Sequence, residues 1–320
     1  RDCLMIATTD QPERFDNARS ENDHAWPAGT PVPWDQDWFH VSADEFEASA
    51  NRAIALPRVY GDDPDRSRPP LNDVVFERRY GGDLAGAQRR LDHIQKIGAD
   101  AIWFCPVFSA ESLHKYDAID HRHIDPHFGP SPEAASTPRV FSNNPDEWIW
   151  TPADRAFVDA FLPEAKERGL RVILDGVWNH VGLAHPAFRD AMNRGKASPY
   201  DAWFDLTYDE SGRAAGWRAW DGRNGRLPAF SQIDSDLAPG PRQHVFDVTK
   251  RWMDPDGDGD PDDGIDGWRL DVANEIGLAF WEDWRNHVRA LNPDAFLLGE
   301  LWFDGSDYFG GKAFDAQMNY

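Results

Sequence analysis

Cysteine, lysine and long apolar runs are scarce in this sequence of 320 residues, and each shortage argues against a class of protein. The two cysteines, Cys3 and Cys105, lie far apart in apolar segments, so we expect buried thiols rather than a disulfide or a metal pair. The longest apolar runs, such as residues 296–298, are much shorter than the roughly 20 residues of a membrane span. Residues 1–20 show no basic stretch followed by an apolar core, so no targeting segment is visible there, and a trimmed precursor stays open.

Positive charge is also scarce, because 33 Lys and Arg residues stand against 56 Asp and Glu residues, which gives a net charge of −23. A surface this acidic repels the phosphates of nucleic acids and the head groups of anionic lipids. We therefore expect neither nucleic acid nor a membrane surface as a partner. Aromatic residues are abundant, with 15 Trp and 19 Phe, which suits either a large core or platforms that stack on sugar rings.

From about residue 83 onward, short apolar runs alternate with segments of helical periodicity. Strands are expected at 101–104, 170–174, 267–270 and 295–298. Helices are expected after the cap residue Asp83, from Thr151 to Gly169, and from Ile276 to Leu291. The repeated strand–helix order indicates an α/β fold whose parallel strands are joined by crossover helices, in a barrel or in a doubly wound sheet.

Three acidic residues, Asp175, Asp271 and Glu300, lie at or directly after the ends of predicted strands, where the catalytic groups of α/β barrels are found. One such acid alone would fit a helix N-cap, but three at successive strand ends favour a shared site. Arg269 lies on the same side of its strand as Asp271 and can keep that carboxylate ionised, as a nucleophile requires. Apolar neighbours should raise the pKa of Glu300, as a general acid requires. Two carboxyl groups with low and high pKa values facing one cleft are the pattern of glycosidases.

The segments around these residues resemble the signature segments of the α-amylase family, glycoside hydrolase family thirteen. The resemblance rests on residues 175–180, 267–275 and 299–302, with further matches at 80–86, 114–117, 124–129 and 314–320. These segments occur in the family's order, and 114–117 and 272–275 are most similar to the neopullulanase, cyclomaltodextrinase and maltogenic amylase branch. A weaker similarity at residues 12–15 implies that residues 4–8 form the first barrel strand.

The resemblance implies a role for each matching residue. Asp271 would be the nucleophile, Glu300 the general acid and base, and Arg269 the residue that orients the nucleophile. Tyr116 would stack on the sugar at the cleavage point, and His180 would form a hydrogen bond with that sugar.

Three further residues take supporting roles by the same resemblance. Trp302, in the segment of Glu300, is assigned to substrate binding. Asp175 would support Arg269 rather than act on the substrate. Asn179 matches a position that binds calcium in some family members and packs structurally in others.

The implied fold is a (β/α)8 TIM barrel, of which about six strands are expected in this chain. We assign residues 1–182 and 246–320 to the catalytic barrel and 183–245 to a small subdomain inserted after the third strand. The family's third catalytic Asp, near the end of strand seven, would lie beyond Tyr320. We therefore expect an excised part of a longer protein that shows little or no hydrolysis by itself, with a degenerate, non-catalytic relative as the alternative.

An acidic run at residues 254–263 has the spacing of a calcium loop. Its residues occupy positions 1, 3, 5, 6, 7 and 9 of an EF-hand-like loop, as Asp254, Asp256, Asp258, Gly259, Asp260 and Asp262, whereas position 12 is Ile265 instead of Glu. Oxygen ligands on a tight turn favour a hard cation, so we expect structural calcium held by the five aspartates. A solvated acidic turn is the alternative.

Together these features predict a retaining glycoside hydrolase that acts on α-1,4-glucosidic bonds in maltodextrins, cyclodextrins, starch or pullulan. An α-glucosidase, an isomerase or a transglycosylase of the same family stays open, as does an amylase-like binding protein without turnover. An α-glucan oligosaccharide or a cyclodextrin is the expected partner, and a homodimer of the full-length protein is left open. The compartment is unknown, with a periplasmic or secreted location favoured over a cytoplasmic one.

Overall fold

The computed structural model describes residues 83–112, 114–130 and 141–320. Five parallel strands form its central sheet, and they lie side by side in chain order. They are β1 (Ala101–Trp103), β4 (Arg171–Gly176), β9 (Gly267–Leu270), β10 (Phe296–Gly299) and β11 (Ala316–Gln317). Neighbours in space that are also neighbours in sequence are typical of a (β/α)8 barrel, so the sheet is a parallel half-barrel, as predicted. The expected strand at residues 4–8 lies outside the described residues.

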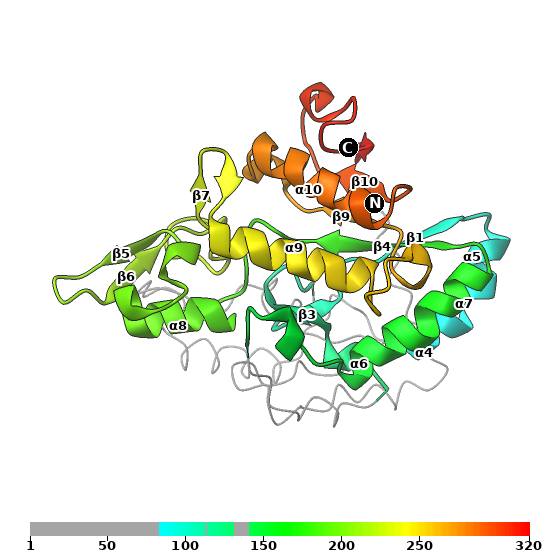
Figure 1. Ribbon diagram of the computed structural model, residues 1–320, viewed down its shortest axis with the longest axis horizontal. Coiled ribbons are helices and arrows are strands. Elements are labelled where there is room, and N and C mark those ends of the chain that lie inside the picture. Colours follow the sequence, from blue (N-terminus) through cyan, green and yellow to red (C-terminus); the bar gives the residue numbers. More distant parts are fainter. Residues whose placement is uncertain (1–82, 113, 131–140) are drawn as a thin grey trace, which may run out of the picture.

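Helices connect these strands, as the periodicity predicts. The helices are α4 (Leu84–Arg89), α5 (Leu91–Lys96), α6 (Pro152–Arg155), α7 (Leu162–Glu167), α9 (Pro239–Met253) and α10 (Leu278–Leu291). In Figure 1, α9 and α10 lie beside each other next to the strands β4 and β9. Their apolar stripes face inward, and the largest side chains of the core are the fully buried Trp178, Trp252, Trp268, Trp281 and Trp284.

The first two predicted helices begin at their predicted caps but are less regular than predicted. Asp83 accepts a hydrogen bond from the Gly86 amide, and Thr151 forms a capping box with Asp154. A break at Arg90 separates α4 from α5. Between α6 and α7 the chain forms a π-helical turn over Ala156–Phe161. Pro163, just after this turn, has no N–H to donate, which disfavours a regular α-helical ladder there.

The stretch inserted between β4 and β9 has its own small elements. They are α8 (Pro186–Arg194), the hairpin of β5 (Leu206–Tyr208) and β6 (Ala214–Trp217), and the hairpin of β7 (Gln232–Ile233) and β8 (Asp236–Leu237). The boundary expected at residue 245 falls inside α9, which begins at Pro239.

A third hairpin, formed by β2 (Phe108–Ala110) and β3 (Ala118–Ile124), lies between β1 and β4 in the chain. Its strand β3 is buried along nearly its whole length, although it carries four polar or charged residues. Short 3-10 helices complete the described fold at Pro126–Phe128, Pro145–Glu147, Gly195–Ala197, Asp201–Trp203, Pro261–Asp263, Ala273–Glu275 and Ser306–Tyr308.

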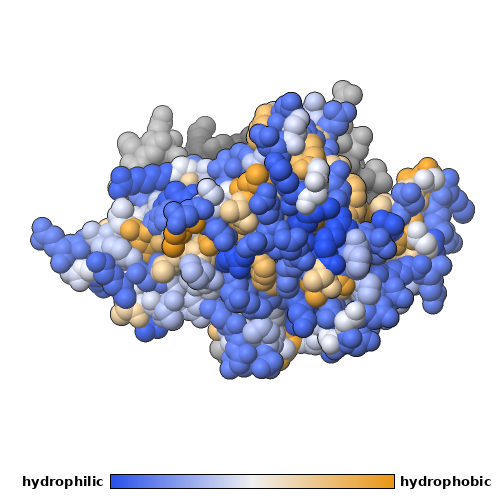
Figure 2. All heavy atoms as spheres, turned by 45° about the horizontal axis from the view of Figure 1, so that its top comes forward, coloured by the Kyte–Doolittle hydropathy of each residue, from blue (hydrophilic) through white to orange (hydrophobic). Residues whose placement is uncertain are grey.

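The surface is mostly hydrophilic on the face drawn in Figure 2, where apolar side chains form small separate patches. Exposed large apolar side chains in the described part include Trp220 and Trp302. Among the described helices, none is both long enough and apolar enough to span a bilayer. Cys105, two residues after the end of β1, is half-buried rather than fully buried, and Cys3 lies outside the described residues.

Candidate active site

Three carboxylates and one guanidinium form a buried cluster at the carboxyl ends of β4, β9 and β10. In the sheet, Asp175 lies opposite Arg269, while Asp271 and Glu300 directly follow the ends of their strands. All four residues are at most 8% exposed. The predicted site acids therefore meet in one place, as expected for residues at adjacent ends of parallel strands.

The guanidinium of Arg269 contacts all three acids. Its Nη1 donates to Asp175 Oδ1 at 2.9 Å and to Asp271 Oδ1 at 2.7 Å, and its Nη2 lies 2.8 Å from Glu300 Oε2. Its Cζ also lies 5.3 Å from the ring centre of Trp103. The two arms of a planar fork thus hold the acids at defined positions, which a lysine ammonium could not do.

The pKa of Asp271 differs from our prediction, and that of Asp175 is shifted in the same direction. Burial, reinforced by the charge of Asp175, raises the pKa of Asp271 to about 8 despite the opposing effect of Arg269. Burial likewise raises the pKa of Asp175 to about 7. The low pKa predicted for Asp271 is therefore not found, because one guanidinium cannot balance three buried carboxylates.

Glu300 departs from prediction in the opposite direction. Burial raises its pKa, but hydrogen bonds and charge outweigh this effect, so that the pKa lies below its ordinary value. The Val272 amide donates to Glu300 Oε2 at 2.8 Å, and the Tyr320 hydroxyl donates to Oε1 at 2.9 Å. The side chain of Asp271 adds to this lowering of the pKa. The apolar neighbours of Glu300 in sequence suggested a raised pKa, whereas its neighbours in space are donors.

Backbone strain at Val272 accompanies its contact with Glu300. Val272 has φ 39° and ψ 48°, in the left-handed region, which β-branched residues rarely adopt. This conformation coincides with the donation of the Val272 amide to the carboxylate of Glu300. Strain of this kind persists where the surrounding structure enforces it, and it often marks functional sites.

Tyr116 and His180 form a second part of the site. The Tyr116 hydroxyl donates to Asp175 Oδ2 at 3.4 Å, and His180 interacts with the backbone of Tyr116. Burial lowers the pKa of His180 to about 4, so its ring is neutral at neutral pH. Its Nδ1 lies 3.1 Å from Asn179 Nδ2, whereas its Nε2 is buried without a hydrogen-bond partner among the described residues. A buried ring nitrogen without a partner is suited to bind a polar ligand group.

The remaining predicted residues have different surroundings. Asn179 is buried, and its side-chain oxygen has no partner in the described part of the chain. Trp302 is 66% exposed and stacks on Tyr320 at a ring-centre distance of 3.7 Å. Sequence reasoning missed the contacts of Trp103, Val272 and Tyr320. Val272 and Tyr320 lie within segments that carried the resemblance, which was the available signal for them.

The acidic loop forms a different cluster from the one predicted. It brings together Asp254, Asp256 and Asp263, which each offer an oxygen within 4.8 Å of the others. Asp258, Asp260 and Asp262 do not join this group. The side chains of Asp258 and Asp260 instead accept amide hydrogens, at 2.7 and 3.0 Å.

Asp263 has the features of a cation ligand. Its Oδ1 is buried without a hydrogen-bond partner among the described residues. Burial raises its pKa, and the charges of Asp254 and Asp256 add to this effect. A hard divalent cation would relieve both costs, so the oxygen donors present fit calcium.

A parallel barrel with paired carboxylates at the ends of its strands is the architecture of barrel glycosidases. The chain matches the family described as alpha amylase, catalytic domain, over residues 11–136 and 154–320, and it belongs to this family.

Similar proteins come from the branch that the sequence resembles. Neopullulanase 2 of Thermoactinomyces vulgaris is 37% identical over 272 residues, which cover 82% of this chain and 40% of that protein. A cyclomaltodextrinase of a Bacillus species is 34% identical over 241 residues, which cover 75% of this chain and 37% of that protein. The chain thus spans 40% or less of the length of these two relatives.

Solved structures of the family share the fold. Cyclic α-maltosyl-(1→6)-maltose hydrolase from Arthrobacter globiformis, in complex with cyclic α-maltosyl-(1→6)-maltose, gives a TM-score of 0.58 at 30% identity. That match covers 75% of this chain and 46% of that structure's chain. The type III pullulan hydrolase from Thermococcus kodakarensis gives a TM-score of 0.60 at 30% identity. That match covers 77% of this chain and 37% of that structure's chain.

Proposed function

We propose that the protein hydrolyses α-1,4-glucosidic bonds in maltodextrins, cyclodextrins, starch or pullulan with retention of configuration. The observation that carries this proposal is the fork of Arg269, which gathers Asp271 and Glu300 at the carboxyl ends of adjacent strands. The names of the similar proteins, among them a neopullulanase and a cyclomaltodextrinase, support this substrate class.

In the first step, an oxygen of Asp271 attacks the anomeric carbon of the sugar and forms a glycosyl ester. Glu300 donates its proton to the leaving glycosidic oxygen as the bond breaks. In the second step, Glu300 removes a proton from water, and the resulting hydroxide displaces Asp271 and releases the sugar. Transfer to a sugar hydroxyl is the same second step with another acceptor.

The pKa values imply a proton shift before the first step. In the folded protein the proton favours Asp271, whose pKa is raised to about 8, over Glu300, whose pKa is lowered. The first step needs an ionised Asp271 and a protonated Glu300. Both carboxyl groups contact the guanidinium of Arg269, so this proton has only a short distance to travel. A sugar that displaces the Tyr320 hydroxyl from Glu300 would remove a donor that stabilises its ionised form.

His180 and Tyr116 would bind the reacting sugar. The buried, neutral ring of His180 has an unpartnered Nε2 that can form a hydrogen bond with a sugar hydroxyl. The half-buried ring of Tyr116 is held by its hydroxyl on Asp175 and offers a stacking surface. Asp175 would act through Arg269 and Tyr116 rather than on the sugar itself.

The proposal is tested by measuring reducing sugars released from maltodextrin, cyclodextrin and pullulan by the whole protein and its variants. Asp271→Asn and Glu300→Gln should each lower the rate by several orders of magnitude, since one removes the nucleophile and the other the proton donor. Asp307→Asn, an exposed acid on a short helix, should leave the rate unchanged. Wild-type turnover in Asp271→Asn would refute the mechanism.

A substrate with a good leaving group separates the two roles. α-Glucosyl fluoride needs no proton to depart, so Glu300→Gln should still form the ester with it, whereas Asp271→Asn should not. The configuration of the first-formed product, followed by NMR, should be that of the substrate. Binding of maltodextrin without turnover in the wild-type protein would instead support a non-catalytic, amylase-like binding protein.

We also propose that calcium binds the acidic loop through Asp254, Asp256 and Asp263. The support is their convergence and the buried, unpartnered oxygen of Asp263. Calcium here would stabilise the turn between α9 and β9 and would take no part in the reaction. An effect of calcium on thermal stability tests this proposal.

A further inference from the structure

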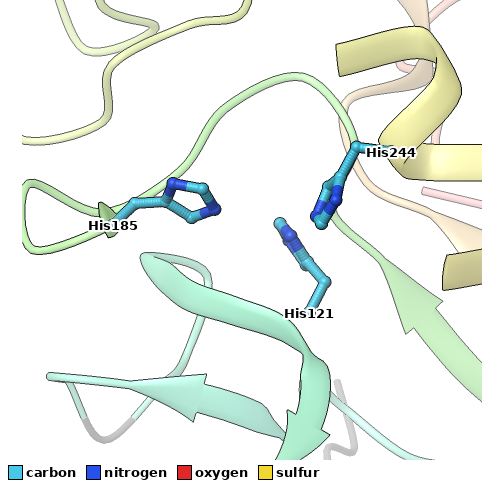
Figure 3. A group of neighbouring side chains, drawn as sticks. All are labelled: His121, His185 and His244. Atoms are coloured by element: carbon cyan, nitrogen blue, oxygen red, sulfur yellow. The ribbon is translucent and has the colours of Figure 1, made fainter. Parts of the chain in front are cut away.

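Three histidines from distant parts of the chain converge in the interior. His121 lies in β3, His185 is the N-cap residue of α8, and His244 lies in α9. All three are at most 2% exposed. Figure 3 shows their rings directed toward a common centre from these three elements.

The three rings form a nearly equilateral triangle. The ring centres of His121 and His185 are 6.4 Å apart, and each lies 6.3 Å from that of His244. One nitrogen of each ring lies within 4.8 Å of the corresponding nitrogens of the other two. Three imidazole nitrogens on one tetrahedral zinc ion would be about 3.3 Å apart, so small ring rotations would close the triangle around an ion.

None of the six ring nitrogens has a hydrogen-bond partner among the described residues. The backbone of Val177 is near His121 and acts weakly on its pKa, but without the geometry of a hydrogen bond. Buried polar groups are almost always paired, so a single unpaired ring would already be unusual. Three adjacent ones indicate a site at which one ligand could contact all three rings.

The surroundings keep these imidazoles neutral and exclude bulk water. Aromatic rings enclose them, including Phe141, Trp178 and Trp203. Burial lowers the pKa of His121 to about 4 and that of His244 to about 3, and it lowers the pKa of His185 as well. The charged groups that act on the cluster are Asp120 and Arg122, which form an ion pair with each other at 2.8 Å. Neutral imidazoles offer the lone pairs that a metal ion binds.

We propose that His121, His185 and His244 bind one divalent transition-metal ion of the zinc class. Three imidazoles suit zinc, copper, nickel or cobalt and disfavour calcium and magnesium, which prefer oxygen ligands. The ion would tie β3, the start of α8 and α9 together, and these segments lie far apart in the sequence. Three protein ligands leave a fourth position for water. This site is separate in its residues from the carboxylate cluster and from the acidic loop.

Cobalt(II) distinguishes this site from the acidic loop, because tetrahedral cobalt with nitrogen ligands absorbs strongly in the visible range and octahedral cobalt with carboxylates absorbs weakly. The purified chain, stripped with a chelator, should bind cobalt with the tetrahedral spectrum at one equivalent. Zinc should then abolish that spectrum by displacement. Absence of a tetrahedral spectrum would overturn the proposal whether or not any variant folds.

Variants assign the signal to the cluster. His244→Phe and His185→Gln should lose the tetrahedral spectrum and the rise in Tm that zinc produces. His93→Gln, an exposed histidine of α5, should keep both. A wild-type spectrum in folded His244→Phe would overturn the assignment. X-ray absorption of the zinc-loaded wild-type chain should count three imidazoles, and a count of one or none would also overturn it.

Discussion

Replacing Asp271 by a side chain that takes up no proton should stabilise the fold at neutral pH while it abolishes turnover. Asp271→Asn keeps an oxygen that can accept from Arg269 Nη1. It also removes the repulsion between Asp271 and Asp175, which is among the causes that raise the pKa of Asp271. The variant therefore resembles the folded protein with Asp271 protonated.

The size of the effect follows from the pKa of Asp271, about 8 in the folded state against 3.8 for the free side chain. Because the folded state holds this proton more tightly, the wild-type free energy of unfolding falls as the pH rises between these two values. The slope is about 1.4 kcal/mol per pH unit, which gives a ceiling of about 4 kcal/mol between pH 4 and pH 7. The repulsion is shared with Asp175, so we expect a gain of about 2 kcal/mol or more at pH 7.

Urea unfolding followed by tryptophan fluorescence measures this gain. Asp271→Asn and wild type should have similar free energies of unfolding near pH 4 and should diverge as the pH rises to 7. Asp307→Asn, which replaces an exposed acid, serves as the matched control. Its free energy of unfolding should equal that of the wild type at both pH values. If Asp271→Asn is less stable than wild type by the same amount at pH 4 and pH 7, burial does not raise the pKa of Asp271 and the reasoning is wrong.

Three further predictions concern local structure. Thr151→Ala removes the capping box with Asp154 and should lower the free energy of unfolding by about 1 kcal/mol in urea titrations, and no change would mean that the cap is dispensable. Gly267→Ala would place a Cβ only 2.1 Å from the Phe296 carbonyl oxygen, so it should cost about 2 kcal/mol or more by the same assay, and a neutral result would show that β9 and β10 can separate. Added calcium should raise the wild-type Tm and should raise that of Asp263→Asn by much less. Equal increases in Tm would mean that calcium does not bind at Asp263.

The strands and the site acids were predictable because their signals are local. Residues 267–270 form an apolar run with one arginine, and β9 has these bounds. The acids at strand ends needed only the rule that parallel strands end on the same side of a barrel. For the same reason, the helix starts at Asp83 and Thr151 could be read from cap residues alone.

Features that depend on contacts in space were not predictable in this way. The apolar sequence around Glu300 gave no sign of the Val272 amide and the Tyr320 hydroxyl that lower its pKa. The spacing of the acidic run favoured alternate aspartates as calcium ligands. In the folded chain, however, Asp263 joins Asp254 and Asp256, whereas Asp258, Asp260 and Asp262 lie outside this group. His121, His185 and His244 lie in separate segments, and each alone is an ordinary buried histidine. Only the packing of β3 and α9 with the start of α8 brings them together.

The alignment of β4 and β9 has a consequence for folding fidelity. Asp175 lies opposite Arg269 in this pair, and Leu298 of β10 lies opposite Arg269 on the other side. Side chains alternate between the two faces of a strand, so shifting β9 by one residue would turn the guanidinium away from all its carboxylates. A sheet with this register shift would therefore lose all contacts between Arg269 and the three carboxylates, rather than only weaken them. The contacts of Arg269 with Asp175, Asp271 and Glu300 therefore favour the correct alignment of β4, β9 and β10.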